Sequence, residues 1–349
     1  PTQKKNPAIK PNKTQELELS VRLDFLNKFS LLASYSTQEN RDQILRLSLS
    51  AASGYSSIVT NAGTLSTKTF ELSLGYTAIQ RPDMSLSFNL IADNTSQLIT
   101  EFEPTPYFDG LQWIKEGNYL TAMYGQRFAT KLSEVENQLP AGEVLENYFT
   151  TNRDGYIIVA GTENTNDEKV HRILDDAGVP INTFKIGDSA PDVSLGLNTD
   201  FSYKSFSINM LWGAQIGGNV YNAGLQRMTQ HGLAGIIDQS EFPEGERKYG
   251  SYFASIYNAN QSVDYYVADA SFLKLREASV SYIMNESMLN KLGAGNFVKK
   301  VRFTAMGKNL LVLSKYTGFD PETGNINNRE DYFEYPLVRS FTGSVEITF

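Results

Sequence analysis

The sequence lacks several features that common protein functions require. It has no cysteine among its 349 residues, which excludes disulfides, zinc–thiolate sites and cysteine nucleophiles in this stretch. It has no apolar run of about 18 residues or more, which excludes a transmembrane helix. Its 31 basic residues are outnumbered by 39 acidic ones, for a net charge of −8. Because nucleic-acid binding depends on clustered Lys and Arg, we expect no nucleic-acid partner.

The amino-terminal stretch Pro1-Thr-Gln-Lys-Lys-Asn-Pro7 lacks the apolar segment of a signal peptide. If the protein is exported, Pro1 is then a processed end or an internal point of a longer chain. Both interpretations stay open from the sequence.

What the sequence does contain is alternation, seen most clearly in residues 339–349. Odd positions there carry apolar side chains or glycine, and even positions carry polar ones. Because successive side chains of a strand point to opposite faces, this pattern predicts a strand with one apolar and one polar face. The apolar face carries Phe341, Val345, Ile347 and Phe349.

The same pattern recurs along the chain and predicts an all-β fold built from antiparallel hairpins. Strands of about ten residues, apolar outside and polar inside, with short turns at one end and long extracellular loops at the other, are typical of an outer-membrane β-barrel. A soluble sandwich with one wet face is the alternative. A phase slip in the strand 272–282 predicts a β-bulge near Arg276 and Glu277. The other predicted strands are 14–26, 29–35, 70–76, 84–90, 193–203, 206–214, 301–307 and 339–349.

Topology makes a complete barrel improbable. The predicted hairpins and the final strand give about nine strands, or about eleven if residues 119–160 form a further hairpin. Either number is odd, so closure would pair the first and last strands in parallel, unlike the even, antiparallel closure of bacterial barrels. Open strand edges are not tolerated in lipid. We therefore expect the chain to supply only a portion of a transmembrane barrel.

Short motifs follow one another along nearly the whole chain. Each is weak alone, but their order and spacing resemble the C-terminal half of SusC/RagA-type TonB-dependent transporters of Bacteroidota. The motifs include Lys10–Leu19, Ser53–Ser57, Lys68–Leu72, Asp269-Ala-Ser-Phe-Leu-Lys-Leu-Arg276, Gly307–Leu310 and Tyr316-Thr-Gly-Phe-Asp-Pro-Glu322.

The resemblance implies a transporter, not an enzyme, located in the bacterial outer membrane with a periplasmic C-terminus. A barrel of about 22 strands would enclose a plug, with this chain, residues 1–349, as its C-terminal part without a plug domain. The implied partners are the N-terminal barrel and plug portion, a SusD-like lipoprotein lid, TonB acting through the plug, outer-membrane lipid, and an oligosaccharide or peptide substrate. No cofactor is implied. A non-transporting scaffold component of an envelope complex is the alternative function.

The resemblance also implies that the final strand belongs to a C-terminal signal for barrel assembly, formed by Phe341, Val345, Ile347 and Phe349. Phe349 as a plain interface aromatic is the alternative. Many relatives carry an Asp- and Gly-rich stretch suited to calcium, where this sequence reads His171-Arg-Ile-Leu-Asp-Asp-Ala-Gly-Val-Pro180. We therefore expect no metal site there.

Loop aromatics are the best candidates for substrate contact, because flat rings give large contact areas and stack on sugar or peptide faces. The alternative is that they pack the loops on one another or on a lid. Inward-facing charges on the strands, such as Arg276 and Lys308, suit a solvated lumen. The predicted aromatic contacts are Tyr107, Phe108 and Trp113 in the first long loop, and Tyr249, Tyr252, Phe253, Tyr257, Tyr265 and Tyr266 in the second.

Overall fold

The computed structural model of the protein describes residues 3–257, 261–293 and 297–349. Its main feature is one antiparallel sheet of nine strands, in the order β2-β3-β6-β7-β14-β15-β18-β19-β20. The strands are β2 (Lys13–Phe25), β3 (Phe29–Arg41), β6 (Thr64–Arg81), β7 (Met84–Glu101), β14 (Val193–Tyr203), β15 (Phe206–Ile216), β18 (Phe272–Asn285), β19 (Lys300–Ser314) and β20 (Ser340–Thr348).

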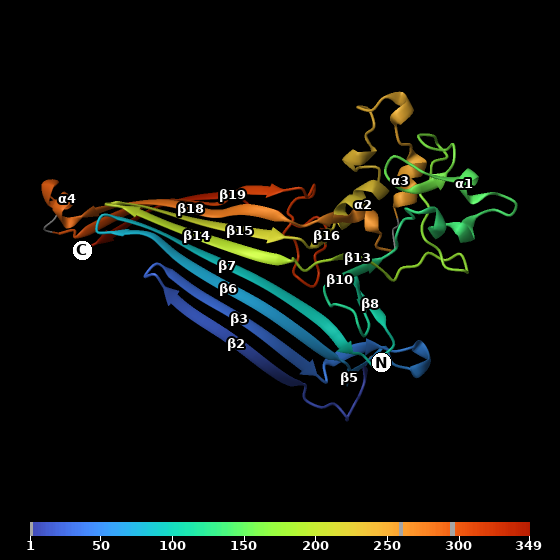
Figure 1. Ribbon diagram of the computed structural model, residues 1–349, viewed down its shortest axis with the longest axis horizontal. Coiled ribbons are helices and arrows are strands. Elements are labelled where there is room, and N and C mark those ends of the chain that lie inside the picture. Colours follow the sequence, from blue (N-terminus) through green and yellow to red (C-terminus); the bar gives the residue numbers. More distant parts are fainter. Residues whose placement is uncertain (1–2, 258–260, 294–296) are drawn as a thin grey trace.

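The sheet is long and curved, and its two ends differ (Figure 1). Short turns, helix α4 (Glu286–Lys291) and the C-terminus lie at one end, and the long connecting segments lie at the other. The tightest turn places Leu26 and Asn27 at φ values of 54° and 51°. Two central residues with positive φ are typical of the two-residue hairpin turn whose twist matches the strands.

The sequence predicted this sheet well, since each predicted strand of the smaller count is a strand of the nine. The proposed hairpin at 119–160 is wrong. Its two halves enter different small sheets: β10 (Ala122–Gly125) pairs with β13 (Phe184–Asp188), and β12 (Ile157–Val159) pairs with β11 (Phe149–Thr151). The structure contains no helix long and apolar enough to cross a membrane within the residues it describes.

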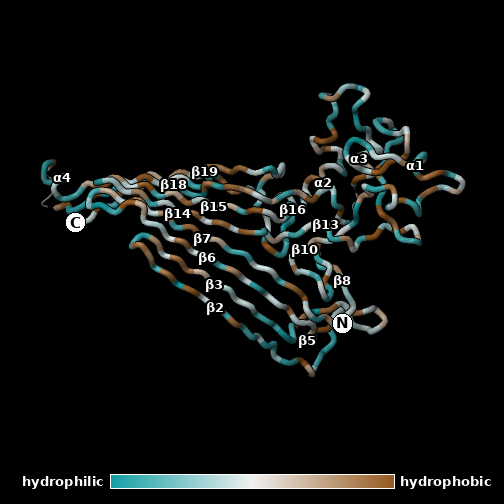
Figure 2. The backbone as a smooth tube through the Cα atoms, viewed as in Figure 1, coloured by the Kyte–Doolittle hydropathy of each residue, from teal (hydrophilic) through white to brown (hydrophobic). Residues whose placement is uncertain are grey.

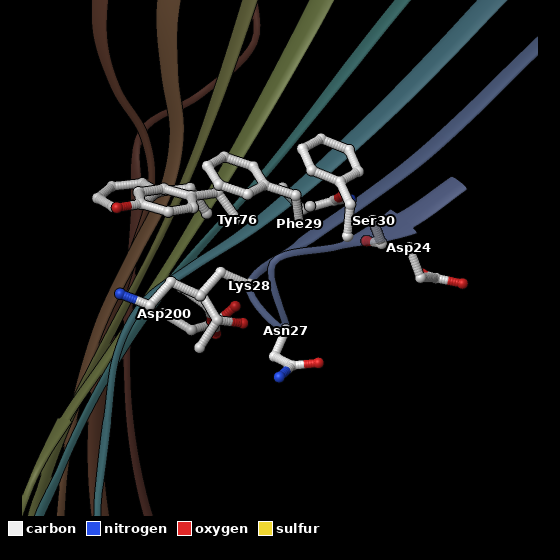
Figure 3. A pocket seen from close by; sticks show the side chains of 13 residues that line it. Asp24, Asn27, Lys28, Phe29, Ser30, Tyr76 and Asp200 are labelled. Carbon is white, nitrogen blue, oxygen red and sulfur yellow. The ribbon is translucent and has the colours of Figure 1, made fainter. Parts of the chain in front are cut away.

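The strand register aligns the apolar positions into one continuous face. Phe29 lies opposite both Phe25 and Tyr76, and Tyr76 lies opposite Phe88. The ring centroids of these successive pairs are 5.0, 4.6 and 6.3 Å apart. Figure 3 shows the rings of Phe29 and Tyr76 on one side of the strands, with the side chain of Asp200 on the other. Cross-strand pairing therefore gathers aromatic side chains into a row near the short turns.

The apolar face is exposed. In β2, Leu17, Leu19 and Val21 keep 61%, 66% and 56% of their surface accessible. In Figure 2, hydrophobic and hydrophilic segments follow one another along the strands, as the alternation predicts. A contiguous apolar surface of this extent marks a contact with a partner or a membrane.

The predicted bulge is confirmed at Arg276. Leu275 pairs with Trp212 and Glu277 with Leu211, so Arg276 is the extra residue of β18. The pairing of β18 with β19 is also irregular here, since Leu275 pairs with Leu311 and Glu277 with Lys308. A bulge places Arg276 and Glu277 on the same, polar side of the sheet, which a regular strand would not do.

Two long segments fold together into a lobe, which we define as residues 119–190, 217–257 and 261–270. It contains β10 to β13, β16 (Asn219–Tyr221), β17 (Val267–Asp269), α1 (Leu145–Tyr148), α2 (Ala223–Gln230) and α3 (Gly250–Ile256). The remaining strands are β1 (Gln3–Lys4), β4 (Ile44–Ser48) and β5 (Ser57–Asn61), which form one small sheet, and the hairpin β8 (Tyr107–Asp109) and β9 (Gln112–Ile114).

The lobe has a dry interior of its own. Phe128, Ile157, Ile256 and Val263 are 0% exposed. Its side chains form two hydrophobic clusters, one around Phe128 and Tyr266 and one around Phe149 and Ile157. The lobe is therefore packed like a small water-soluble domain at one end of the sheet.

Candidate functional site

The hairpin β8–β9 carries the first group of predicted aromatic contacts. Phe108 and Trp113 lie opposite each other, with ring centroids 4.5 Å apart. Phe108 is 37% exposed, and Trp113 and Tyr107 are half-buried. Tyr107 packs against Phe102 at 6.1 Å. The hairpin thus presents an aromatic pair that a solute can reach.

The second group of predicted contacts lies in the lobe, and its members differ in exposure. Tyr252, Phe253 and Tyr266 keep only 3%, 6% and 1% of their surface and belong to the lobe core. Burial also raises the pKa of Tyr266 to about 12. For these three residues the structure favours the alternative that the loops pack on one another. Half-buried members of the group are Tyr249, Tyr257 and Tyr265.

A buried ion pair, which was not predicted from the sequence, joins the two segments of the lobe. Lys248 Nζ lies 2.6 Å from Glu168 Oε1, and the two side chains are 4% and 0% exposed. Asn152 also donates to Glu168 Oε1 at 2.9 Å, and the Asn164 amide donates to Glu168 Oε2 at 2.7 Å. No spacing signal links residues this far apart in the chain, so only the fold reveals the pair.

Asp264 connects two lobe segments. Its carboxylate accepts from the backbone amide of Phe128 at 3.3 Å. Burial raises the pKa of Asp264 to about 6, against the opposing effects of the Phe128 amide and Arg127. The carboxyl therefore takes up a proton near pH 6, above the usual range of aspartate.

A second charged cluster joins the sheet to the loop before β20. Lys274 Nζ lies 2.7 Å from Asp320 Oδ1 and 2.8 Å from Glu322 Oε2. Arg276 Nη2 lies 2.7 Å from Glu322 Oε1. Burial alone would raise the pKa of Glu322, but the hydrogen bonds from Arg276 and Lys274 outweigh it and hold that pKa below its usual range.

Of this cluster, the sequence analysis singled out only Arg276 as an inward charge. A signal was present, because two of the quoted motifs contain the opposite charges. Lys274 and Arg276 lie in the motif 269–276, and Asp320 and Glu322 lie in the motif 316–322. The two motifs carry complementary charges, but the sequence alone did not show that they meet.

His171 and Asp175 have partners within the lobe. His171 Nδ1 lies 2.9 Å from Gln138 Oε1, and burial lowers the pKa of His171. Asp175 accepts from the amides of Ala177 and Val179, which closes a turn. Within residues 3–257, 261–293 and 297–349, no group of three or more His, Cys, Asp or Glu side chains is arranged to hold a metal ion.

The C-terminal strand lies at the edge of the sheet. Among the described residues it pairs with β19 alone. Its predicted signal residues are all exposed on the apolar face or at its end: Phe341 at 76%, Val345 at 60%, Ile347 at 49% and Phe349 at 77%.

Several known proteins are similar to this chain in sequence. No family model matches the sequence. TonB-dependent receptor P3 of Formosa agariphila is 26% identical over 97% of this chain and 34% of the receptor. TonB-dependent receptor P39 of the same organism is 24% identical over 82% of this chain and 30% of the receptor.

Solved structures agree in fold. The RagAB peptide importer in its open-open state matches with a TM-score of 0.72 at 18% identity, over 100% of this chain and 36% of that chain. Its closed-closed state matches with a TM-score of 0.71 at 18% identity, over 97% of this chain and 35% of that chain. This chain resembles SusC/RagA-type TonB-dependent transporters.

The predicted resemblance is thereby confirmed, together with the antiparallel, barrel-type sheet. The SusC/RagA-like chain spans about a third of the length of the curated relatives it matches, at 34%, 30% and 35%. The activity and the partners of the full-length relatives are therefore proposals for this chain.

Proposed function

We propose that this chain forms part of the wall and the extracellular loops of an outer-membrane TonB-dependent importer. The observation that carries the proposal is the apolar face of the nine-stranded sheet, whose leucines in β2 keep up to 66% of their surface. In water such a face would associate or aggregate, whereas in a bilayer it is solvated by lipid tails. The loop lobe then lies outside the membrane, and β20 ends on the periplasmic side.

Closure of the barrel requires further strands. Among the described residues, β2 and β20 each have one neighbour in the sheet, and they run in the same direction. Unpaired backbone groups are not tolerated in the hydrocarbon region. The remaining barrel portion therefore supplies an odd number of strands, which makes the total even and every pairing antiparallel. The same portion would carry the plug on which TonB acts.

The substrate is proposed to be an oligomeric nutrient, either an oligosaccharide or a peptide, captured under a SusD-like lipoprotein lid. Energy delivered by TonB to the plug would open a path inside the barrel. We assign substrate contact first to Phe108 and Trp113, which are accessible, and next to Tyr107. The half-buried members of the second group are secondary candidates: Tyr249, Tyr257 and Tyr265.

The edge strand supports a role in assembly. Its apolar residues are exposed and in register with β19, as expected of an edge strand that pairs with a further strand in the membrane. We propose that Phe341, Val345, Ile347 and Phe349 are recognised during insertion. Replacing Phe349 with Ala is expected to lower the amount of folded protein in the outer membrane, and Thr348→Ala, on the polar face, is the control.

Uptake tests the transport proposal. Cells with and without the gene are supplied with fluorescent oligosaccharides and fluorescent peptides. Accumulation is measured in each, with and without functional TonB. We expect one substrate class to be taken up only when both the importer and TonB are present. Unchanged uptake of both classes, with loss of an envelope complex, would support the scaffold alternative instead.

A further inference from the structure

The segment 316–331, which we call the strap, touches three parts of the molecule. It leaves the end of β19 and crosses toward the lobe before the chain returns to β20. Its contacts with the sheet and the aromatic hairpin are polar, and in the lobe Tyr316 also packs against Val220 and Ala270. Together they make it a connection between the sheet and the proposed substrate contacts.

The first contact is ionic and lies on the polar face of β18. Asp320 and Glu322 bind Lys274, whose side chain is only 4% exposed, at 2.7 and 2.8 Å. Glu322 also takes two hydrogen bonds from Arg276, at 2.7 and 3.2 Å. The bulge directs Arg276 across Gly213, where an added Cβ would lie 2.2 Å from Nε of the arginine. The bulge and Gly213 therefore make room for this contact.

The second contact reaches the aromatic hairpin. The side-chain amide of Gln112 donates to the backbone carbonyl of Asn327. Gln112 is the neighbour of Trp113 in β9 and lies opposite Asp109 in β8. The strap turns back on itself here, since the Asn325 amide donates to the Asn328 carbonyl at 3.0 Å. The tip of this turn thus holds the strand that carries Trp113.

The third contact fixes the far end in the lobe. The amide of buried Tyr221 donates to the Arg329 carbonyl at 2.9 Å, and the Asp331 amide donates back to the Tyr221 carbonyl at 2.8 Å. The Tyr316 hydroxyl donates to Asp331 at 2.7 Å and so ties the two ends of the strap together. The tip at Asn327 therefore lies between the ionic contact of Glu322 and the lobe contact of Arg329.

We propose that Asp320 and Glu322 are positioning residues that act through the strap to hold the Phe108–Trp113 pair in place. The inference rests on the proposed function, because it concerns the same aromatic contacts. Neutralising Glu322 leaves buried Lys274 with Asp320 alone and takes the carboxylate partner from Arg276, so the strap would lose much of its hold on β18. The hairpin would then lose the support of its Gln112 contact.

Hydrogen–deuterium exchange of the full-length protein in detergent tests the proposal. We expect Glu322→Gln to speed exchange at least about tenfold in residues 317–331 and also in 107–114. The matched control is Glu277→Gln, which breaks a 3.6 Å ion pair with Lys308 on the same face without touching the strap. It is expected to leave both segments unchanged. Partial recovery of protection in Glu322→Asp would show that the charge matters.

A change confined to 317–331 would overturn the proposal, because the strap would then be a local clasp with no hold on the hairpin. No change in either segment would overturn it as well. The variant Gln112→Ala serves if Glu322→Gln fails to assemble. We expect it to speed exchange in 107–114 and to leave 317–331 protected, and an unchanged hairpin would count against the proposal. Since exchange needs no substrate, these outcomes are independent of the uptake test.

Discussion

The sheet and the lobe use the same apolar side chains in opposite ways. In the sheet, Leu19 and Leu23 keep 66% and 50% of their surface, on a face that runs across every strand. In the lobe, Ile157 and Val263 keep none. Both regions have ordered backbones, so poor folding does not explain the exposed leucines. The difference is what the proposed function requires, with lipid as the solvent of the sheet and water as the solvent of the lobe.

Charged pairs also differ in burial from place to place in the molecule. The polar face of the sheet carries accessible pairs such as Arg302 and Glu346, whose side chains are 41% and 65% exposed at a separation of 3.9 Å. The lobe instead encloses Lys248 and Glu168 completely. A buried pair is costly to separate, whereas an exposed pair contributes little. Removing one partner should therefore reduce stability much more for the buried pair Lys248–Glu168 than for the exposed pair Arg302–Glu346.

The largest effect is expected from Lys248→Ala in the lobe. Removing the cation leaves Glu168 buried and uncompensated, which costs about 3–5 kcal/mol. The local free energy of unfolding, measured by hydrogen exchange of lobe peptides, should fall by that amount. The exposed neighbour Lys169→Ala is the control and should change it little. Equal effects of the two variants would contradict a buried clasp.

A large cavity effect is expected from Ile157→Ala. Its side chain is 0% exposed, so truncation removes packing that the lobe cannot replace, at a cost of about 2–5 kcal/mol. Val144→Ala in the same lobe, where Val144 is 54% exposed, should cost less than about 0.5 kcal/mol. Resistance of the lobe to limited proteolysis reports the difference. If both variants behave alike, the lobe is not packed as a water-soluble domain.

A charge placed on the sheet separates its two faces. Leu19→Arg, at the middle of β2, should destabilise the barrel by about 2–4 kcal/mol, because a cation would lie in the hydrocarbon region. Ser20→Arg, one residue later on the polar face, should be tolerated. The fraction of protein that stays folded in the outer membrane, judged by heat-modifiable migration in gels, is the measurement. Equal tolerance at both positions would contradict a lipid-facing side.

The smallest expected effect is a pair of opposite pH dependences. Asp264 has its pKa raised to about 6 in the folded state, so its contribution to stability is greatest below the unfolded value of 3.8 and is lost as pH rises through about 6. Glu322 has a lowered pKa, so its contribution is present above the unfolded value of 4.5 and is lost as pH falls through the folded pKa.

Hydrogen exchange at pH 7 and pH 5, corrected for the intrinsic rates, is compared between the wild type and Asp264→Asn, because burial lowers the pKa of His171 in the same lobe and that group acts in the opposite direction. Relative to the variant, the wild-type lobe should gain protection at the lower pH, while protection near Glu322 should stay unchanged. An equal response of the lobe in the wild type and in Asp264→Asn would rule out the assignment.

The sheet was predictable from sequence because its signal is local. The alternation of apolar and polar residues predicted the strands and the face to which each side chain points. The break in that alternation located the bulge at Arg276. The nine strands follow one another in the sheet in the same order as in the chain, joined alternately by short turns and long loops. The aromatic row at Phe29 and Tyr76 follows from the register alone.

The lobe was not predictable because its contacts are long-range. β10 pairs with β13 across about 60 residues that include β11 and β12, so no local pattern indicated the pairing and a hairpin within 119–160 was expected instead. Tyr252, Phe253 and Tyr266 resemble surface aromatics in sequence, and only the fold shows that they meet in one core. The Lys274–Glu322 contact lies between these cases, since its two motifs were visible but their meeting was not.

One measurement tests the central claim most directly, namely that the exposed apolar face contacts lipid. Single cysteines are placed in turn at positions 17 to 24 of the full-length protein, spin-labelled in outer-membrane vesicles, and probed with oxygen and with a water-soluble nickel complex. We expect labels at Leu17, Leu19, Val21 and Leu23 to respond mainly to oxygen, and labels at the alternate positions to respond mainly to nickel. Uniform access of the nickel complex along the strand would contradict the barrel wall and leave a water-exposed sheet that requires a protein partner.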